Sequence, residues 1–524
     1  MLMKRTLLMP MLLLAAIGVS LAWQGSSIKR ISMGALRDKI EGGWAGQMIG
    51  VSYGAPTEFR YLQRTIPEKD LPEWTPSKVK EALDQDDLYV DMTLAKVLDD
   101  KGINATTEDF GAMFKDAKYR LWHANLASRR ALKRGVPAAL AGTPKYNVHA
   151  NDIDFQIEAD FIGLMAPGLP QSVNDISWRA GRVMNYGDGI YGGMFVGCMY
   201  AAAFFEADPR KLVEAGKACL PEKSLYSALI GDVLAWSKEL PADWIGVWNR
   251  IEEKWNKREP CPAGALHPFN IDAKLNGAYI AIGLLYGKGD MGETVRISTR
   301  CGQDSDCNPS SAAGILGVVL GYKNIPDHWK GGIAALAESK FNYTDFSFRT
   351  IVDSSLKRAV QLVEANGGRL RGDQLTVKTQ NAKPAKLEVW DDFGSPVERL
   401  GVESPRWSWR GDWVVSTPNP RRPGVRKVSN QKGAEASIEF EGTGVILGGP
   451  YLPTGGKAEV YLDGKLHQTV DVYPDEDAVK SGESVWHAFG LKNGKHTVRL
   501  VVTGETYPGS KGADIGVENL IVFR

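Results

Sequence analysis

The spacing of apolar residues changes near residue 386, and this change divides the chain into two parts. From about residue 30 to 365 apolar residues recur mostly at helical spacing, in Ala- and Gly-rich segments that let helices pack closely. Gly314, Gly317 and Gly321 leave one helix face without side chains. The pattern predicts an all-α domain over residues 30–370, with another helix packed against that bare face.

Beyond residue 386 alternation replaces the helical spacing. Residues 436–440 alternate between apolar and polar side chains, as strands with one buried face do. Asp463-Gly464 and Asn493-Gly494 are typical two-residue hairpin turns. Several such strands over residues 386–524 predict a β-sandwich. The predicted fold class is therefore multidomain α and β, a helical domain followed by a β-sandwich.

The N-terminus has the layout of a secretory signal peptide. Lys4 and Arg5 precede an apolar run that ends in Ser20-Leu21-Ala22. The run is shorter than the roughly 20 apolar residues that cross a bilayer. We expect residues 1–22 to be a signal peptide and the mature chain to be periplasmic or secreted, without stable membrane insertion. An uncleaved N-terminal anchor is the alternative.

The charge balance gives no indication of a nucleic-acid partner. The chain has 63 basic and 62 acidic residues, and removal of Lys4 and Arg5 with the signal peptide leaves 61 and 62. Nucleic-acid binding relies on a basic excess or patch. We expect no nucleic-acid partner.

Five cysteines cannot all pair within one chain. Cys198, in a run of small residues, is expected to be a buried free thiol. Cys301 and Cys307 bracket an acidic loop, and the sequence leaves open whether they pair. Because the chain contains no C-x-x-C pair, the sequence does not predict a thiolate zinc site.

Three acidic clusters occur in the helical region. The first, Asp84-Gln85-Asp86-Asp87, precedes a helical run. Adjacent carboxylates repel one another unless a cation or solvent screens them. The alternative is an ordinary helix N-terminus, where capping and the helix dipole favour Asp.

The second cluster is the loop from Cys301 to Pro309, which contains Asp304 and Asp306. Alternate carboxylates in a loop bounded by Gly can direct several oxygens to one point. The loop is not an EF-hand, because Pro309 and Ile315 stand where Gly and Glu are needed. Oxygen ligands from two loops suit Mg²⁺, Mn²⁺ or Ca²⁺ better than zinc or copper.

The third cluster spans residues 152–160, and its spacing fits either a strand or a helix. The cluster is either a solvated face or part of a site. Nearby polar and aromatic residues suit a sugar pocket, although a lone histidine is more often structural. The predicted substrate-binding residues are Trp122, His123, Asn125, Asp154, Glu158, Asn185 and Asp188.

Taken in order, the motifs resemble the ADP-ribosylglycohydrolase family. They are the segment from Gly43 to Gly50, Pro56-Thr57-Glu58-Phe59, Gln85-Asp86-Asp87 and the loop around Asp304 and Asp306. The resemblance covers roughly residues 35–345. It implies an all-α fold with a binuclear magnesium site that hydrolyses N- or O-glycosidic bonds of ADP-ribosylated targets.

By this resemblance the expected metal ligands are Glu58, Asp86, Asp87, Asp304 and Asp306, and the expected catalytic residues are Glu58 and Asp304. The chain departs from the family pattern where the family has hydroxyl residues beside the aspartate pairs. Gln85, Leu88 and Cys307 stand there, and Gln47 replaces a common Asp. A thiol binds Mg²⁺ poorly, so one of the two metals is expected to be weakened, altered or absent.

The C-terminal region resembles galactose-binding-like jelly-roll domains of secreted polysaccharide-degrading enzymes. Trp407 and Trp409 are two residues apart and share one side of a strand. They either stack on sugar rings or contact the helical domain.

These expectations combine into an exported, divalent-metal-dependent glycoside hydrolase that acts on a carbohydrate. Mg²⁺, as one or two ions, is the expected cofactor, with Mn²⁺ or Ca²⁺ as substitutes. Glu58 is expected to act as acid or base, with Asp154 or Glu158 in reserve. The acidic third cluster would repel a diphosphate, which argues against ADP-ribose. The alternatives are an ADP-ribosyl hydrolase and a carbohydrate-binding protein without catalysis.

Overall fold

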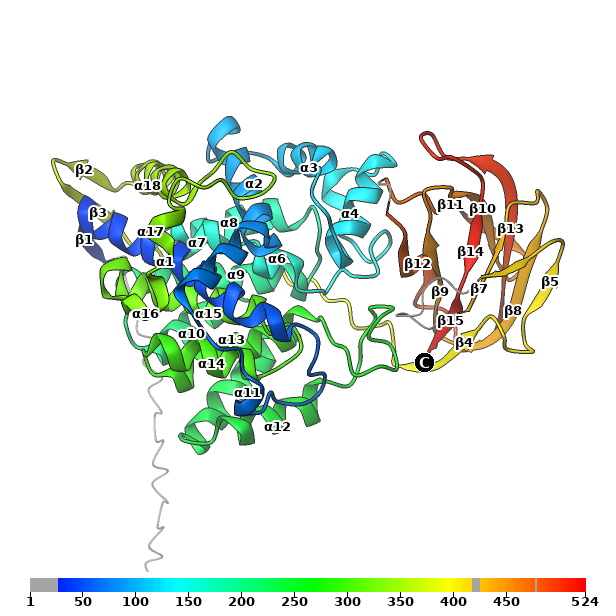
Figure 1. Ribbon diagram of the computed structural model, residues 1–524, viewed down its shortest axis with the longest axis horizontal. Coiled ribbons are helices and arrows are strands. Elements are labelled where there is room, and N and C mark those ends of the chain that lie inside the picture. Colours follow the sequence, from blue (N-terminus) through cyan, green and yellow to red (C-terminus); the bar gives the residue numbers. More distant parts are fainter. Residues whose placement is uncertain (1–26, 417–424, 476–477) are drawn as a thin grey trace, which may run out of the picture.

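The computed structural model describes residues 27–416, 425–475 and 478–524 (Figure 1). The predicted signal peptide lies outside these residues. The helices are α1 Met33–Gly54, η1 Ala55–Thr57, η2 Glu68–Asp70, η3 Pro76–Asp84, α2 Asp86–Lys101, α3 Thr107–Asp116, α4 His123–Lys133, α5 Ala138–Ala141, α6 Asp154–Ile157, α7 Asp160–Leu164, α8 Pro170–Gly181, α9 Asp188–Ala203, α10 Pro209–Ala218, α11 Leu225–Glu239, α12 Trp244–Trp255, α13 Ala273–Gly287, α14 Met291–Arg300, α15 Cys307–Leu320, η4 Tyr322–Asn324, α16 Asp327–Lys330, α17 Ile333–Leu336 and α18 Phe348–Ala365.

The strands are β1 Ile28–Ser32, β2 Arg369–Arg371, β3 Gln374–Lys378, β4 Pro396–Gly401, β5 Ser408–Arg410, β6 Val414–Ser416, β7 Arg426–Ser429, β8 Glu435–Gly442, β9 Gly444–Tyr451, β10 Gly456–Leu462, β11 Lys465–Asp471, β12 Lys480–Ala488, β13 Gly494–Thr506, β14 Ile515–Val517 and β15 Asn519–Phe523.

The predicted helical region is confirmed, and a small antiparallel sheet closes it. Its strand order is β1-β3-β2, and Ile28 pairs with Lys378. The sheet joins the two ends of the helical region, and its last strand ends at Lys378. Periodicity missed the sheet because its strands have three to five residues.

Helices α1 and α15 pack backbone to backbone through glycines spaced at intervals of four residues, Gly42, Gly46, Gly50 and Gly54. A Cβ atom on Gly46 would lie 2.1 Å from the carbonyl oxygen of Ala313, so no side chain fits there. The bare face predicted for α15 is confirmed, since a Cβ on Gly317 would lie 2.0 Å from Gly42 O. This contact sets the C-terminal end of α1 beside the loop that precedes α15.

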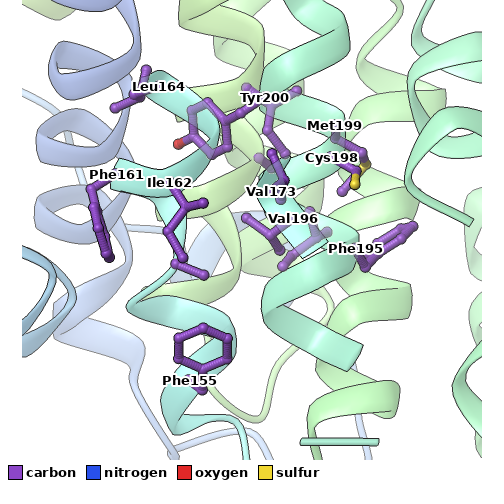
Figure 2. Close-up of a cluster of buried hydrophobic side chains, with 14 of the residues drawn as sticks. Phe155, Phe161, Ile162, Leu164, Val173, Phe195, Val196, Cys198, Met199 and Tyr200 are labelled. Atoms are coloured by element: carbon purple, nitrogen blue, oxygen red, sulfur yellow. The ribbon is translucent and has the colours of Figure 1, made fainter. Parts of the chain in front are cut away.

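Helix α9 runs through the core of the helical region. Figure 2 shows Val196 of α9 near Ile162 of the short helix α7, with Phe161 of α7 and Phe195 and Met199 of α9 in the same cluster. All five side chains are fully buried. Among the described residues, no helix is both long enough and apolar enough to span a membrane.

Cys198, on α9, forms a disulfide with Cys219 at the end of α10. The prediction of a free thiol at Cys198 is therefore wrong, because small neighbours leave room for a bridge as readily as for a buried thiol. Cys261, Cys301 and Cys307 are free and buried, so Cys301 and Cys307 do not pair with each other.

This pairing predicts the labelling of the denatured mature chain. An alkylating reagent should modify three of the five cysteines before reduction and all five after it. Mass spectrometry of the digested chain should find one disulfide-linked peptide pair, joining Cys198 to Cys219. Labelling of all five cysteines without reductant would contradict the bridge.

The C-terminal region contains two main antiparallel sheets that share one core. Their strand orders are β11-β10-β13-β8-β5 and β12-β9-β15-β4, and a smaller sheet has the order β14-β7-β6. Residues 436, 438 and 440 of β8 point into the core with residues of β9, β13 and β15, which confirms the predicted alternation. The predicted β-sandwich is present.

Of the two predicted hairpin turns, one is confirmed and one is wrong. Asp463-Gly464 joins β10 to β11, and both residues have positive φ, as a two-residue turn of this kind requires. Asn493-Gly494 precedes β13, but the preceding strand β12 belongs to the other sheet. The segment therefore crosses between sheets and forms no hairpin.

Trp407, Trp409 and Trp413 pack on their own sandwich. Trp407 is 7% exposed, and its ring stacks on Trp409 with the ring centroids 5.2 Å apart. Trp413 meets the edge of Trp409. Strand β5 lies at the end of the sandwich away from the helices (Figure 1). Trp407 therefore neither faces a sugar nor contacts the helical region.

The two regions contact each other through ion pairs and a small apolar cluster. Arg134, the residue after α4, donates from Nε to Asp471 of β11 over 2.9 Å and also pairs with Asp475. Trp390 and Phe523 pack against residues 148–150. These contacts fix α4 and the segment after it against the sandwich (Figure 1).

Candidate metal centre and active site

The loop that carries Asp304 and Asp306 is held by backbone contacts to the segment after α1. Gly302 has φ +78°, and a Cβ atom there would lie 2.5 Å from Tyr61 O. Gln303 also has positive φ; its backbone donates to Tyr61 O and accepts from the N–H of Phe59, both at 3.0 Å. The loop therefore stands beside Glu58.

The side chain of Gln303 ties this loop to a third segment. It donates from Nε2 to Pro268 O over 2.9 Å and accepts the N–H of Asn270 over 3.0 Å. The loop between α12 and α13 is thereby fixed to the acidic loop. Sequence analysis missed Gln303, since nothing in its spacing distinguishes it from a surface glutamine.

The early and late aspartate pairs meet at one place. Asp86 and Asp87 begin α2, so the helix-terminus reading of this cluster is also correct. The thiol of Cys307, the first residue of α15, donates to Asp87 Oδ2 over 3.3 Å. Ligand atoms of Asp304, Asp306 and Cys307 lie within 4.8 Å of one another. The structure thus brings together four carboxylates from segments about 220 residues apart in sequence.

Burial and mutual repulsion hold protons on these carboxylates in the absence of a cation. Burial, with the charges of Asp306 and Asp86, raises the pKa of Glu58 to about 8, although its side chain reaches solvent. Burial and Asp306 raise the pKa of Asp86 to about 6. The pKa values of Asp87 and Asp304 are raised well above their ordinary range, first by burial.

This donor set fits a hard divalent cation. Asp87 Oδ1 and Asp304 Oδ1 are buried, and neither has a hydrogen-bond partner among the described residues. Buried carboxylates without partners are costly, and a cation with oxygen ligands relieves that cost. Asp86, Asp87, Asp304, Asp306 and Glu58 would hold such an ion.

The raised pKa values predict how the stability of the metal-free chain depends on pH. Because Glu58 and Asp86 have folded pKa values near 8 and 6, above their unfolded values, the native state binds more protons than the unfolded state. Their contribution is complete below about pH 4 and is lost as pH rises through 6 to 8. With chelator, the melting temperature should fall from pH 5 to 8.5, and saturating Mg²⁺ should reduce that fall. A flat profile in chelator would contradict the electrostatic argument.

The third acidic cluster is neither a strand nor a solvated face. It forms the short helices α6 and α7, and its residues are buried. Asp154 accepts the N–H of Asn125 over 2.9 Å and that of Ala124 over 3.3 Å at the start of α4. Asp154 therefore caps α4, and its substrate-binding role stays a prediction.

Glu158 is better placed than Asp154 to take part in the site. Its Oε1 accepts a hydrogen bond from Asn125, and its Oε2 is buried without a partner in the described chain. Burial raises its pKa well above the ordinary range, and the charges of Asp154 and Asp86 add to this. Glu158 thus extends the acidic region beyond Asp86.

Asn185 and Asp188 have structural contacts that sequence analysis did not foresee. Asn185 is fully buried and donates to the carbonyls of Ala150 and Asp152 at 3.0 and 2.9 Å. Asp188 accepts the N–H of Tyr226 over 3.2 Å. These bonds hold neighbouring segments together, and the substrate-binding role of Asn185 and Asp188 stays a prediction. The sequence does not distinguish an asparagine or aspartate that hydrogen-bonds to the backbone from one that binds a ligand.

Trp122 and His123 are adjacent in sequence, but their side chains have different surroundings. Trp122 is 45% exposed, and the ammonium of Lys480 lies 5.1 Å from its ring centroid, at the junction with the sandwich. His123 stacks on Phe269, with the ring centroids 5.7 Å apart, and Phe269 in turn contacts Phe59. Burial lowers the pKa of His123 to about 3. His123 and Phe269 thus form an aromatic wall next to Glu58.

Tyr89 and Tyr343 are further residues that the motifs did not indicate. The ring centroids of Tyr89 and Tyr343 are 5.0 Å apart. Burial and the charge of Asp86 raise the pKa of Tyr89. Tyr343 is 50% exposed and has φ +60°. An exposed aromatic ring on a strained backbone is a feature of binding sites.

Comparisons with known proteins agree with this geometry. A family model described as ADP-ribosylglycohydrolase matches residues 32–364, more than half of the chain. A solved structure named "ADP-ribosylglycohydrolase-related protein complex" is 17% identical and covers 62% of this chain and 98% of that one, with a TM-score of 0.38.

Two curated relatives come from Flavonifractor plautii. An A type blood alpha-D-galactosamine galactosaminidase is 32% identical over 20% of this chain and 9% of that protein. An A type blood N-acetyl-alpha-D-galactosamine deacetylase is 34% identical over 17% of this chain and 11% of that protein. The chain thus spans about a tenth of the length of these relatives. On the match over residues 32–364, the chain belongs to the ADP-ribosylglycohydrolase family of hydrolases.

Proposed function

We propose that this protein is an exported hydrolase that cleaves a glycosidic bond of a carbohydrate with the help of a divalent metal ion. The observation that carries the proposal is the convergence of Asp86, Asp87, Asp304 and Asp306 in a member of a typically metal-dependent family. Two of these aspartates have buried oxygens without a hydrogen-bond partner in the part of the chain that the structure describes. Mg²⁺ fits the all-oxygen donor set best, and Mn²⁺ or Ca²⁺ can replace it.

The metal, when bound, would supply positive charge that grips sugar hydroxyls and lowers the pKa of water. The protein residues divide the remaining tasks. Of the five expected metal ligands Glu58 is the most exposed, so it serves as the acid or base at the glycosidic oxygen. Glu158 is the reserve carboxyl group, since Asp154 is committed to capping α4.

A neutral or amino sugar is a better substrate for this site than ADP-ribose. The curated relatives act on galactosamine-containing glycans, by their names. The aromatic rings of Phe59, Phe269 and Tyr343 offer faces for a sugar ring.

Export and carbohydrate binding by the sandwich belong to the same proposal. The disulfide between Cys198 and Cys219 supports an oxidising compartment. The sandwich, packed on α4, would hold a polymeric substrate near the helical region in the manner of galactose-binding-like domains.

A paired assay tests this function against the two alternatives. The purified mature chain is incubated with a panel of nitrophenyl glycosides and galactosamine-containing glycans, and separately with peptides ADP-ribosylated on Arg or Ser. Each reaction is run with chelator and with Mg²⁺, Mn²⁺ or Ca²⁺. Metal-dependent sugar release that Glu58→Gln loses supports the proposal. Release of ADP-ribose alone would replace it with ADP-ribosyl hydrolysis. Glycan binding without turnover would replace it with a silent binding protein, which Cys307 in place of a hydroxyl favours.

A further inference from the structure

A second cluster of metal-ligand side chains lies in the helical region, apart from the aspartate pairs. It comprises His123 at the start of α4, His149 and Asp152 before α6, and Cys261 in the loop between α12 and α13. One ligand atom from each residue lies within 4.8 Å of the other three. Three segments that are distant in sequence therefore converge on one point.

Two of the distances between these atoms are those of a tetrahedral metal site. Zinc bonds of about 2.0 to 2.3 Å to nitrogen, oxygen and sulfur place tetrahedral ligand atoms roughly 3.3 to 3.8 Å apart. His123 Nδ1 lies 3.6 Å from Asp152 Oδ2 and 3.8 Å from Cys261 Sγ. His149 Nδ1 lies 2.7 Å from Asp152 Oδ2, so these two groups would exchange a hydrogen bond for bonds to the ion.

Several buried polar atoms in the cluster lack hydrogen-bond partners among the described residues. Asp152 is fully buried and His149 is 4% exposed, and neither Asp152 Oδ1 nor His149 Nε2 has a partner among the described residues. Glu259, also buried, faces the same cluster and has an unpartnered Oε2. The nearby ammonium of Lys274 is paired with Asp272. A cation would balance this charge.

We propose that His123, His149, Asp152 and Cys261 bind one zinc ion. Imidazole and thiolate ligands favour zinc over Mg²⁺, which prefers oxygen, and four protein ligands are typical of a structural zinc site. Glu259 accepts the N–H of Cys261 over 2.9 Å and orients the loop that carries the thiol. The absence of a C-x-x-C pair hid this site from sequence analysis, because each ligand segment contributes only one or two residues.

The proposed zinc ion would shape the wall of the active site. It would tie the loop between α12 and α13 to the start of α4, and that loop also carries Phe269, which stacks on His123 and contacts Phe59 beside Glu58. Cys261 and Cys307 share a small buried apolar cluster, so the two metal centres are neighbours. The proposal rests on these contacts and does not depend on the carbohydrate substrate.

The test measures metal bound to the purified mature chain. After removal of all metals, the chain is titrated with Zn²⁺ and, in parallel, with Co²⁺ as a spectroscopic probe. We expect about one zinc ion per chain at this site and a thiolate-to-cobalt charge-transfer band. Cys261→Ala should abolish the band, and His123→Ala should weaken zinc binding by more than about 100-fold.

Two control variants test whether the charge-transfer band arises from Cys261. Cys301→Ala removes another buried free cysteine and should leave the band unchanged. Asp304→Asn/Asp306→Asn removes the aspartate pair and should also leave it unchanged, which separates this proposal from the proposed function. Absence of tight zinc binding to the native chain would overturn the zinc site. So would equal zinc affinity in His123→Ala, a folded variant by its circular dichroism, at a position where the side chain is 24% exposed.

Discussion

Asp304→Asn is expected to reduce hydrolysis by more than about 1,000-fold and to remove the stabilisation that Mg²⁺ confers on the chain. Asp304 is 2% exposed and faces Asp306 and Asp87, and its Oδ1 has no partner among the described residues. The amide has nearly the same shape but carries no charge for a cation. At 100 times its dissociation constant Mg²⁺ should add about 2.7 kcal/mol to the native chain and add far less to the variant.

The same substitution should not destabilise the metal-free chain. It removes a buried carboxyl group that repels Asp306 and Asp87, so the melting temperature in chelator should stay the same or rise. Asp345→Asn, at an exposed carboxylate paired with Lys340, is the matched control and should change neither activity nor the Mg²⁺ response. A variant that keeps full activity, or unfolds in chelator, would show that Asp304 has a packing role instead.

Gly46→Ala is expected to destabilise the helical region by about 3 kcal/mol. The added methyl would lie 2.1 Å from Ala313 O and 2.5 Å from the carbon of that carbonyl, and both are backbone atoms of α15 that no rotamer change can move. Helices α1 and α15 would have to separate, and Glu58 would move away from the loop that carries Asp304. Denaturant unfolding measures the loss, and Mg²⁺ affinity should fall with it.

Gly34→Ala supplies the matched control on the same helix. Its Cβ would meet nothing within 4 Å, so the substitution should be neutral or should stabilise by up to about 1 kcal/mol. Equal unfolding free energies for the two variants would mean that the close contact between α1 and α15 is not what positions the acidic loops.

The sequence predicted the parts of the fold that have long, regular patterns. Helical spacing and the glycines of α15 identified the helical region and its closest contact, and alternation at residues 436–440 identified the sandwich. Sequence analysis missed the sheet of β1, β2 and β3 because its strands are short and because β1 pairs with β3 from the other end of the helical region. Asn493-Gly494 has the composition of a hairpin turn, but composition does not reveal which sheet the next strand joins.

The candidate site was predictable where adjacent residues carry it. Asp86 with Asp87 and Asp304 with Asp306 were identified as pairs, and the structure brings them together. The role of Asp154 could not be foreseen, because a carboxylate that caps a helix of distant sequence looks the same as one that faces a ligand. The cluster around Cys261 assembles its residues only through tertiary packing.

Calorimetric titration of the metal-free mature chain with Mg²⁺, at pH 7 in two buffers of different ionisation enthalpy, tests the central claim most directly. The account predicts saturable binding with release of protons, because the cation displaces protons from carboxyl groups such as Glu58, whose pKa is raised to about 8. Asp304→Asn should lose both the binding and the proton release. Absence of binding to the native chain, or binding that Asp304→Asn retains, would contradict a metal centre at the aspartate pairs.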